Sequence, residues 1–366
     1  MEKASRISTR LRRRFRRGIA QGWSWPRFGV QLFFLLLVLR IGWDFAGFVS
    51  HHQTLGAEPF VDRPAGVDGF LPISALMSVK YWLATGLVHP FHPAGFVLLL
   101  IFIGVSVLFK KAFCSWICPV GMLSEFLGRF GKFTFSRNLR LPRWLDIPLR
   151  SLKYLLLGFF LNAVLRMSAQ ALGSFLDSPY NRIADIKMYK FFARMTPFSL
   201  GVIVTLVLLS LVIRHFWCRY LCPYGALVGF LSLLSVYKIT RIAPACTDCG
   251  LCAKVCPADL PVHQLNRVRS DECTGCVECV ASCPVDGALA FAPPGLVQKP
   301  AARLKPVWLA VAVLLVFLVP VGAARLAGLW DSSVSDAEYR MRIQESDSMI
   351  YNHTGGDAPP DPRLRE

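Results

Sequence analysis

The sequence is poor in charged residues and has no cysteine outside a repeated motif. Charged residues make up 17% of its 366 residues and hydrophobic residues 54%, and the mean hydropathy is +0.45. This balance excludes an ordinary soluble enzyme and predicts several apolar segments that span a bilayer. Because all twelve cysteines fall in regular spacings, structural disulfides are not expected. The segments that carry the cysteines are predicted to face a reducing cytoplasm.

Acidic residues are scarce as well, with 23 Asp and Glu against 41 Lys and Arg and a formal net charge of +18. Nucleic-acid-binding proteins carry such a surplus, but much of it lies here directly before the first apolar segment, where the positive-inside rule accounts for it. We therefore predict contact with membrane lipid and no nucleic-acid partner. A cleavable signal peptide is not expected, because the first apolar segment is too long and no small-residue cleavage site follows. The basic run consists of Arg6, Arg10, Arg12, Arg13, Arg14, Arg16 and Arg17.

Five apolar stretches are predicted to be spanning helices, because each is close to the roughly 20 residues that a bilayer requires. They are residues 28–49, 94–112, 149–172, 197–216 and 305–324. With the basic N-terminus inside, segments 110–150 and 217–303 are predicted to be cytoplasmic, whereas the remaining loops and the tail after residue 325 lie outside. Residues 73–88 are too short and polar for a span, so we expect an interfacial or re-entrant helix there.

Eight cysteines form two copies of one spacing, C-x2-C-x2-C-x3-C-P, within 246–257 and 273–284. Bacterial ferredoxins hold two [4Fe–4S] clusters with this run, and the fourth cysteine of each run then ligates the other run's cluster. The predicted ligand sets are Cys246, Cys249, Cys252 and Cys283 for one cluster, and Cys273, Cys276, Cys279 and Cys256 for the other. CxxC pairs also suit tetrahedral zinc, but two complete four-cysteine copies favour clusters.

The remaining cysteines form a second repeat, C-x3-C-P-x-G, at Cys114 and Cys118 and again at Cys218 and Cys222. Each copy follows an apolar stretch that runs from outside to inside and precedes an amphipathic segment. Two such units of the same orientation are related by an axis along the membrane normal. This axis would bring both CxxxCP motifs to one place at the inner surface.

Local charge is expected to favour thiolates at these four sulfurs. Proline directly after the second cysteine of each motif suits the first position of a helix, where the helix dipole stabilises a thiolate. The nearby basic residues are Lys110, Lys111, Arg214 and Arg219. Three interpretations stay open: a third iron–sulfur cluster, a dithiol relay or soft-metal site such as Cu(I), and small thiols packed at helix ends.

Other ionisable residues are weaker candidates. Four histidines are predicted to lie in the outer loop: His51, His52, His89 and His92. One interpretation is that they ligate a metal or shape a quinol site. The other is that they lie at the membrane interface in a proline-stiffened turn. No two histidines lie at opposite depths of two spans, so a bis-histidine haem is not indicated. His215 adjoins Cys218 and is expected to snorkel to the interface rather than to tune that site.

Two further features lie in or near the first span. Arg40 and Asp44 share a helix face inside it, where ionisable residues are functional candidates, although they would also pair with each other. The run Arg63–Pro72 is a rigid candidate surface for a partner or a quinone.

With both motif pairs in this order, the chain resembles the membrane polyferredoxins, the 4Fe-4S binding family typified by NapH, YccM, NosR and CcoG. The resemblance covers roughly residues 28–325 and is closest in layout to NapH and YccM. It implies a bacterial inner-membrane protein with a cytoplasmic iron–sulfur domain, which passes electrons between the quinone pool or a cytoplasmic donor and a redox partner. The large flavin domain of NosR-like members and the C-terminal domain of CcoG-like members are not expected here.

The expected fold class is mostly α, a polytopic membrane helical bundle with two parallel pseudo-repeats and a small α+β ferredoxin-like domain before the last span. The expected domains are a basic cytoplasmic segment 1–27, a membrane domain 28–240, a ferredoxin domain 241–295, a last span 303–325 and an acidic periplasmic tail 326–366 that is disordered at its end.

The sequence shows no acid–base or nucleophile constellation, so we expect an electron-transfer component, such as a subunit of a quinol-linked oxidoreductase, rather than a stand-alone catalyst. The alternatives are a factor that reduces copper for cofactor assembly and a redox-sensing membrane regulator.

Overall fold

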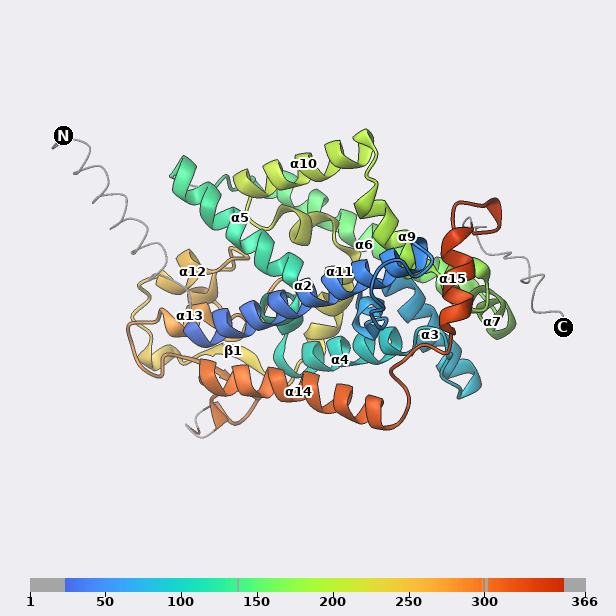
Figure 1. Cartoon of the computed structure of the whole chain (residues 1–366). Coiled ribbons are helices and arrows are strands. Elements are labelled where there is room, and N and C mark those ends of the chain that lie inside the picture. Colours follow the sequence, from blue (N-terminus) through green and yellow to red (C-terminus); the bar gives the residue numbers. More distant parts are fainter. Residues whose placement is uncertain (1–23, 137, 298, 300–301, 352–366) are drawn as a thin grey trace. The chain divides into compact units, whose positions relative to one another are not determined.

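The computed structural model describes residues 24–136, 138–297, 299 and 302–351, which form helices and one two-stranded sheet (Figure 1). The chain divides into two compact units. Unit 1 comprises Met1–Leu35, Ile103–Leu156 and Val202–Val316, and unit 2 comprises Leu36–Phe102, Leu157–Gly201 and Phe317–Glu366. All twelve cysteines belong to unit 1. The basic run before the first span lies outside the described residues.

Among the described residues, three helices are long and apolar enough to cross a membrane. They are α2 (Trp25–Gln53), residues Trp144–Arg166 of α6 (Arg143–Arg166), and α14 (Pro306–Leu326). A helix suits a bilayer because it pairs its own backbone N–H and C=O groups where no water is available. The predicted mostly helical membrane fold is thereby confirmed.

Two other predicted spans take a different form. α4 (Pro93–Phe109) is apolar but shorter, and α10 (Pro197–Val212) is long enough only together with α9 (Ala184–Ala193), from which it is bent by 80°. The break falls just before Pro197, where the preceding residue disfavours helical backbone angles. Five spans in two parallel repeats therefore stay a prediction.

Two helix ends follow from local sequence. The predicted span 149–172 was too long, because α6 ends earlier and α7 (Ala169–Leu176) begins after Ser168, whose hydroxyl accepts the Ala171 N–H at 3.1 Å. A serine oxygen at this position satisfies one of the free N–H groups of a helix start. The helix expected at 73–88 is present as α3 (Pro72–Thr85). It ends at Gly86, which adopts the left-handed conformation that glycine permits, with a φ of +78°.

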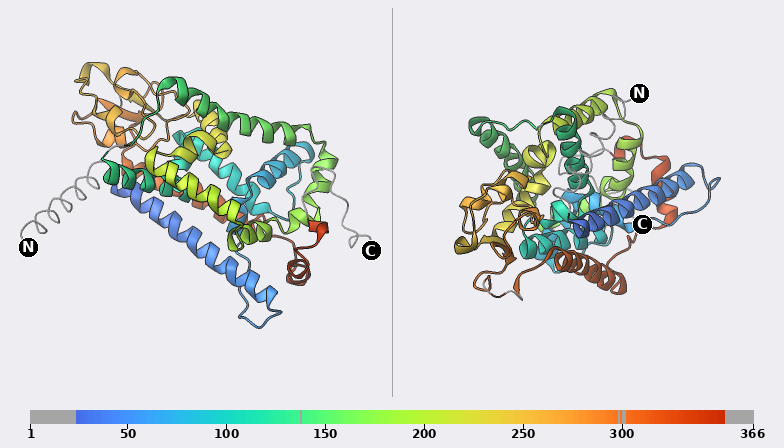
Figure 2. Two further views of the ribbon diagram at one scale, coloured as in Figure 1. Left: turned by 90° about the horizontal axis from the view of Figure 1, so that it is seen from above. Right: turned by 90° about the vertical axis from the view of Figure 1, so that its left-hand side faces the viewer.

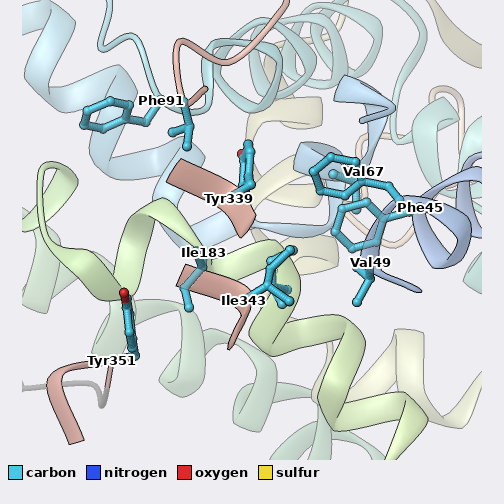
Figure 3. Close-up of a cluster of buried hydrophobic side chains, with 11 residues drawn as sticks. Phe45, Val49, Val67, Phe91, Ile183, Tyr339, Ile343 and Tyr351 are labelled. Carbon is cyan, nitrogen blue, oxygen red and sulfur yellow. The ribbon is translucent and has the colours of Figure 1, made fainter. Parts of the chain in front are cut away.

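The buried core of unit 2 joins all three of its chain segments (Figure 3). Phe45 of α2, Val67 of η1 (Ala65–Phe70) and Ile183, which lies between α8 (Pro179–Arg182) and α9, belong to one cluster with Tyr339 and Ile343 of α15 (Asp336–Gln344). The C-terminal segment is therefore part of the core of this unit before the chain continues through η8 (Met349–Tyr351).

The segment 326–366, predicted to be an acidic tail, contains the helix α15. Its start is fixed by Ser335, whose hydroxyl accepts the Glu338 N–H at 3.3 Å, in the S-x-x-E pattern of a capping box. The predicted disorder concerns the end of the tail, and residues 352–366 lie outside the part of the chain that the structure describes.

Unit 1 contains a small α+β domain, drawn yellow to orange in Figure 2. The strands β1 (Lys238–Arg241) and β2 (Leu289–Ala292) pair in antiparallel fashion with Ile239 opposite Phe291, and β2 is buried throughout. The short helices α12 (Leu251–Val255) and α13 (Glu278–Ala281) each carry the third cysteine of one run. The turns η5 (Ala243–Ala245) and η6 (Val262–Gln264) complete this predicted ferredoxin-like fold.

Candidate metal centres

Each ferredoxin-type cysteine set lines one cavity of unit 1. One cavity is lined by Cys246, Cys249, Cys252 and Cys283. The other is lined by Cys256, Cys273, Cys276 and Cys279. Each cavity thus receives three sulfurs from one run and the fourth from the other run. This is the exchange that two-cluster ferredoxins require, so the residues present fit two cubane clusters.

The two cavities differ in exposure. The first contains the exposed Cys249, whereas in the second Cys256, Cys276 and Cys279 are buried. Burial raises the pKa of Cys256 to about 11 and that of Cys276 to about 12. Metal binding must therefore replace the thiol protons. In the described part of the chain, no three His, Cys, Asp or Glu side chains converge as a single ion would need.

The two CxxxCP motifs share one backbone conformation. The residues between the cysteines form single π-helical turns, η2 (Phe113–Ile117) and η3 (Trp217–Leu221). Cys118 and Cys222 are the N-caps of α5 (Pro119–Phe135) and α11 (Pro223–Leu231), each with proline at the first helical position, as predicted. The Cys222 sulfur accepts the Gly225 N–H at 3.2 Å. α11 continues into the turn η4 (Ser232–Leu234).

The four motif cysteines lie close enough for their charges to interact. Cys118 and Cys222 act on Cys114, and Cys114, Cys118 and Cys222 act on Cys218. The ring centroids of Phe113 and Tyr224, one from each motif region, are 5.5 Å apart. The structure therefore brings both motifs to one place, which we call the CxxxCP site.

The expectation that local charge favours free thiolates at the CxxxCP site is wrong for three of its sulfurs. Burial raises the pKa of Cys114 to about 12 and that of Cys118 to about 11, and it raises the pKa of Cys218 well above its usual value. The backbone N–H of Gly121 lowers the pKa of Cys118, and the charge of Lys111 lowers the pKa of Cys114, but neither effect outweighs burial. Desolvation is stronger here than the helix terminus.

A cavity lined by several ionisable side chains adjoins the CxxxCP site. It is lined by Cys114, Cys218, Arg27, Lys111, Ser115, Gly121, Glu125, His215, Arg219, Pro257, Ala258, Glu272 and Thr274. His215 thus faces the same cavity as Cys218 and does not snorkel as expected. Burial lowers the pKa of His215 to about 4, so its imidazole is neutral at pH 7.

Lys111 is buried beside the CxxxCP site. Burial alone would lower its pKa, but the sulfur of Cys114, the carboxylate of Glu272 and the sulfurs of Cys222 and Cys218 raise it above its usual value. Glu272 also binds the Lys153 ammonium at 2.5 Å. A buried ammonium is stable only beside negative charge, and the CxxxCP sulfurs supply part of that charge when they are ionised.

A network of four charges connects three distant segments of unit 1. The Arg27 guanidinium of α2 lies 2.5 Å from Glu125 of α5 and 2.7 Å from Glu278 of α13. Arg129 closes the network, at 2.6 Å from Glu125 and 3.0 Å from Glu278. Despite burial, Arg27 and Arg129 hold the pKa of Glu125 at about 2. The network fixes the helix that carries Cys279 beside α2 and α5.

The outer-loop histidines of unit 2 have separate environments. His92 donates to the Asp68 carboxylate at 3.0 Å and to the Asn181 carbonyl at 2.7 Å, whereas His51 contacts the Glu58 carbonyl at 2.6 Å. His52 packs on Phe48, and His89 lies 3.4 Å from Asp177. These histidines do not form one site.

The other polar candidates of unit 2 have structural partners. Arg40 and Asp44 bind each other at 2.8 Å, as one of the two alternatives predicted. Arg63 is buried between Asp68 and Asp185, so the Arg63–Pro72 run is anchored by an internal ion pair.

Sequence reasoning missed several residues beside the metal centres. Arg27, Glu125 and Glu278 carried no signal, because their contacts join positions 98 and 251 residues apart. Ser115 and Trp116 lie inside the first CxxxCP motif, but only the structure shows that they contact the second ferredoxin run.

Comparison with known proteins agrees with the motifs. A family described as "4Fe-4S binding domain" matches residues 91–138 and 195–241, and one described as "4Fe-4S dicluster domain" matches residues 238–289. The "Putative electron transport protein YccM" of Escherichia coli is 48% identical over 88% of this chain and 90% of its own length.

More distant relatives cover less of the chain. The "Methylamine utilization ferredoxin-type protein MauN" of Methylobacillus flagellatus is 29% identical over 64% of this chain and 76% of its own length. The "Regulatory protein NosR" of Pseudomonas aeruginosa is 28% identical over 45% of this chain and 22% of its own length. No solved structure matches the chain.

Proposed function

Since the chain belongs to the membrane polyferredoxin family, with its 4Fe-4S domains and a close relative in YccM, we propose that it is a membrane-bound iron–sulfur protein that passes electrons between a quinone or a cytoplasmic donor and a redox partner protein. The observation that supports this most directly is the pair of four-cysteine cavities. When bound there, [4Fe–4S] clusters supply one-electron acceptors. The chain's own residues bury one cavity and leave the other open at Cys249, where a soluble partner has access.

The exchanged ligand pattern gives a direct test. Cys283→Ser is expected to remove the cluster of the first run, and Cys256→Ser the cluster of the second run, although each residue belongs to the opposite run. Iron and sulfide analysis of anaerobically purified full-length protein, together with EPR, distinguishes the two losses. The assignment would be contradicted if each variant lost the cluster of the run in which the replaced cysteine lies, or if the protein contained zinc in place of iron.

We propose that the CxxxCP site holds a third metal centre, either a cluster or a soft ion such as Cu(I). The support is that the four cysteines lie close enough for their charges to interact with one another and with the buried ammonium of Lys111. With a third cluster the protein contains about twelve irons, and without it about eight. Cys114→Ser combined with Cys218→Ser is expected to remove only the third centre. If the wild type has eight irons and no other metal, a third centre is absent.

The positive-inside rule supports a cytoplasmic N-terminus and ferredoxin domain and a periplasmic tail. An N-terminal fluorescent-protein fusion is expected to be bright, and a C-terminal alkaline phosphatase fusion active. The opposite result at either end would reverse the proposed orientation.

A quinone is the proposed carrier on the membrane side, as the resemblance implies. A direct test is to add a quinol analogue to the purified, oxidised protein in detergent. The loss of cluster absorbance then measures the reduction. If the analogue does not reduce the protein but a low-potential cytoplasmic-type donor does, the quinone is excluded as the donor and a cytoplasmic donor is favoured. A redox-sensing regulator predicts no sustained turnover with either donor, and a copper-reducing factor predicts turnover with Cu(II) as acceptor.

A further inference from the structure

The two ferredoxin runs have loops of the same backbone shape. Left-handed φ angles occur at matching positions after the first cysteine of each run: +51° at Asp248 and +62° at Gly275, then +71° at Gly250 and +54° at Val277. Both loops thus follow one geometry around their cavities. Their surroundings are different, however, because the first CxxxCP motif contacts the second loop.

The second loop is bound by residues from inside the first CxxxCP motif. The Ser115 hydroxyl donates to the Thr274 carbonyl at 2.7 Å, and the Trp116 indole N–H donates to the Gly275 carbonyl at 3.1 Å. Trp116 is completely buried. Both acceptors lie between Cys273 and Cys276, so the motif holds the backbone of the loop itself.

Glycine is required where this loop makes its closest approach. A Cβ atom at Gly275 would lie 2.5 Å from the Phe109 carbonyl oxygen, whereas one at Gly250 of the first loop would meet nothing within 4 Å. The first loop carries Asp248 where the second carries Gly275. The second loop is therefore packed against the segment that precedes Cys114.

The peptide that Ser115 holds is also the one that contacts a cluster-binding sulfur. In a trans peptide the C=O and the next N–H point in opposite directions. With the Thr274 carbonyl directed at Ser115, the Gly275 N–H points the other way, and this N–H favours the charged form of the Cys273 sulfur. Hydrogen bonds to ligand sulfurs are one of the factors that set the reduction potential of a cluster.

We propose that Ser115 and Trp116 are positioning residues for the second ferredoxin cluster, which orient the peptides of the Cys273–Cys276 loop toward its sulfurs. The inference rests on the proposed ligation by Cys256, Cys273, Cys276 and Cys279. It makes the two clusters unequal: the loop of the second is bound by the CxxxCP motif, whereas the loop of the first is bound at Asp248 by Arg241, at 2.9 Å. It does not require a metal at the CxxxCP site.

The test is an EPR-monitored redox titration of the full-length, cluster-loaded protein in detergent. Ser115→Ala and Trp116→Phe are each expected to shift the midpoint potential of the second cluster to lower values, because a weaker N–H···S bond stabilises the reduced state less. The first cluster is expected to keep its midpoint. Its signal is assigned by its loss in Cys249→Ser, and iron content is measured for every variant.

Tyr220→Phe is the matched control. Tyr220 occupies in the second motif the position that Trp116 occupies in the first, and its buried hydroxyl donates to Asp146 at 2.7 Å rather than to a cluster loop. It is expected to leave both midpoints unchanged. Unchanged midpoints in both Ser115→Ala and Trp116→Phe, an equal shift of both clusters, or the same shift in Tyr220→Phe would overturn the inference. A wild type that lacks iron would instead overturn the proposed function itself.

Discussion

Replacing Arg27 by methionine is expected to destabilise unit 1 more than any exposed charge substitution on the same helix. Only 1% of the Arg27 side chain is exposed, and its guanidinium serves both Glu125 and Glu278. With Arg129 the network contains two positive and two negative charges. Methionine keeps most of the aliphatic volume but leaves two carboxylates for one guanidinium, so the loss is mainly electrostatic.

The size of the effect follows from the burial of the partners. Removing one partner of a buried ion pair costs about 3–5 kcal/mol, because the remaining charge stays desolvated. Arg129 still reaches both carboxylates, at 2.6 and 3.0 Å, and compensates in part. We therefore expect a cost near the lower limit, about 3 kcal/mol. One carboxyl group is then expected to take up a proton near neutral pH.

Thermal unfolding in detergent, combined with the iron retained after heating, measures the loss. Arg40→Met is the control, because Arg40 lies on the same helix with 73% of its side chain exposed and binds the single partner Asp44, so its removal leaves no buried pair of carboxylates. Adding Glu278→Gln to Arg27→Met removes one charge of each sign and is expected to recover part of the stability. Equal melting temperatures for Arg27→Met and Arg40→Met, or no recovery in the double variant, would refute this reasoning.

Two further predictions concern a close contact and a titrating pair. Gly121→Ala is expected to destabilise the CxxxCP site and lower its metal content, since the new Cβ would lie 2.0 Å from the Cys114 carbonyl oxygen, whereas Gly104→Ala, with open space around it, is expected to be tolerated. Although burial lowers it, the Asp68 carboxylate raises the pKa of His92 above 6.5, so this pair stabilises unit 2 fully below about pH 6.5 and less as pH rises through the raised pKa. Melting temperatures measured across that range are expected to fall in the wild type but not in His92→Gln.

The features that could be predicted from the sequence are those set by neighbouring residues. The spacing of the eight ferredoxin cysteines was sufficient for the two sets that line the cavities, because a cluster loop is a local structure. Proline after Cys118 and Cys222 correctly predicted two helix starts. The apolar stretches predicted a helical membrane protein, since length and hydropathy are local properties.

The features that could not be predicted depend on contacts between distant segments or on desolvation. The contact of Trp116 with Gly275 joins positions 159 residues apart, and nothing in either motif indicates it. The prediction of free thiolates considered the helix dipole of Cys118 but not the burial that raises its pKa. The helix α15 had a capping signature at Ser335 and Glu338, yet its acidic composition concealed the core residue Tyr339.

The adjacent residues Lys110 and Lys111 show how one backbone distortion serves two centres. Lys110 has a φ of +62°, a conformation that costs a non-glycine residue roughly 1–2 kcal/mol. The reversal directs its ammonium to the Ser232 carbonyl at 3.2 Å, on the side of Cys273, while Lys111 faces the sulfurs of the CxxxCP site. A regular helix would place these two neighbours only 100° apart on one surface. The strain therefore separates two buried positive charges, one beside Cys273 of the second ferredoxin run and one beside the CxxxCP site. Part of the basic surplus of the chain thus lies beside its cysteine sets rather than at the membrane surface.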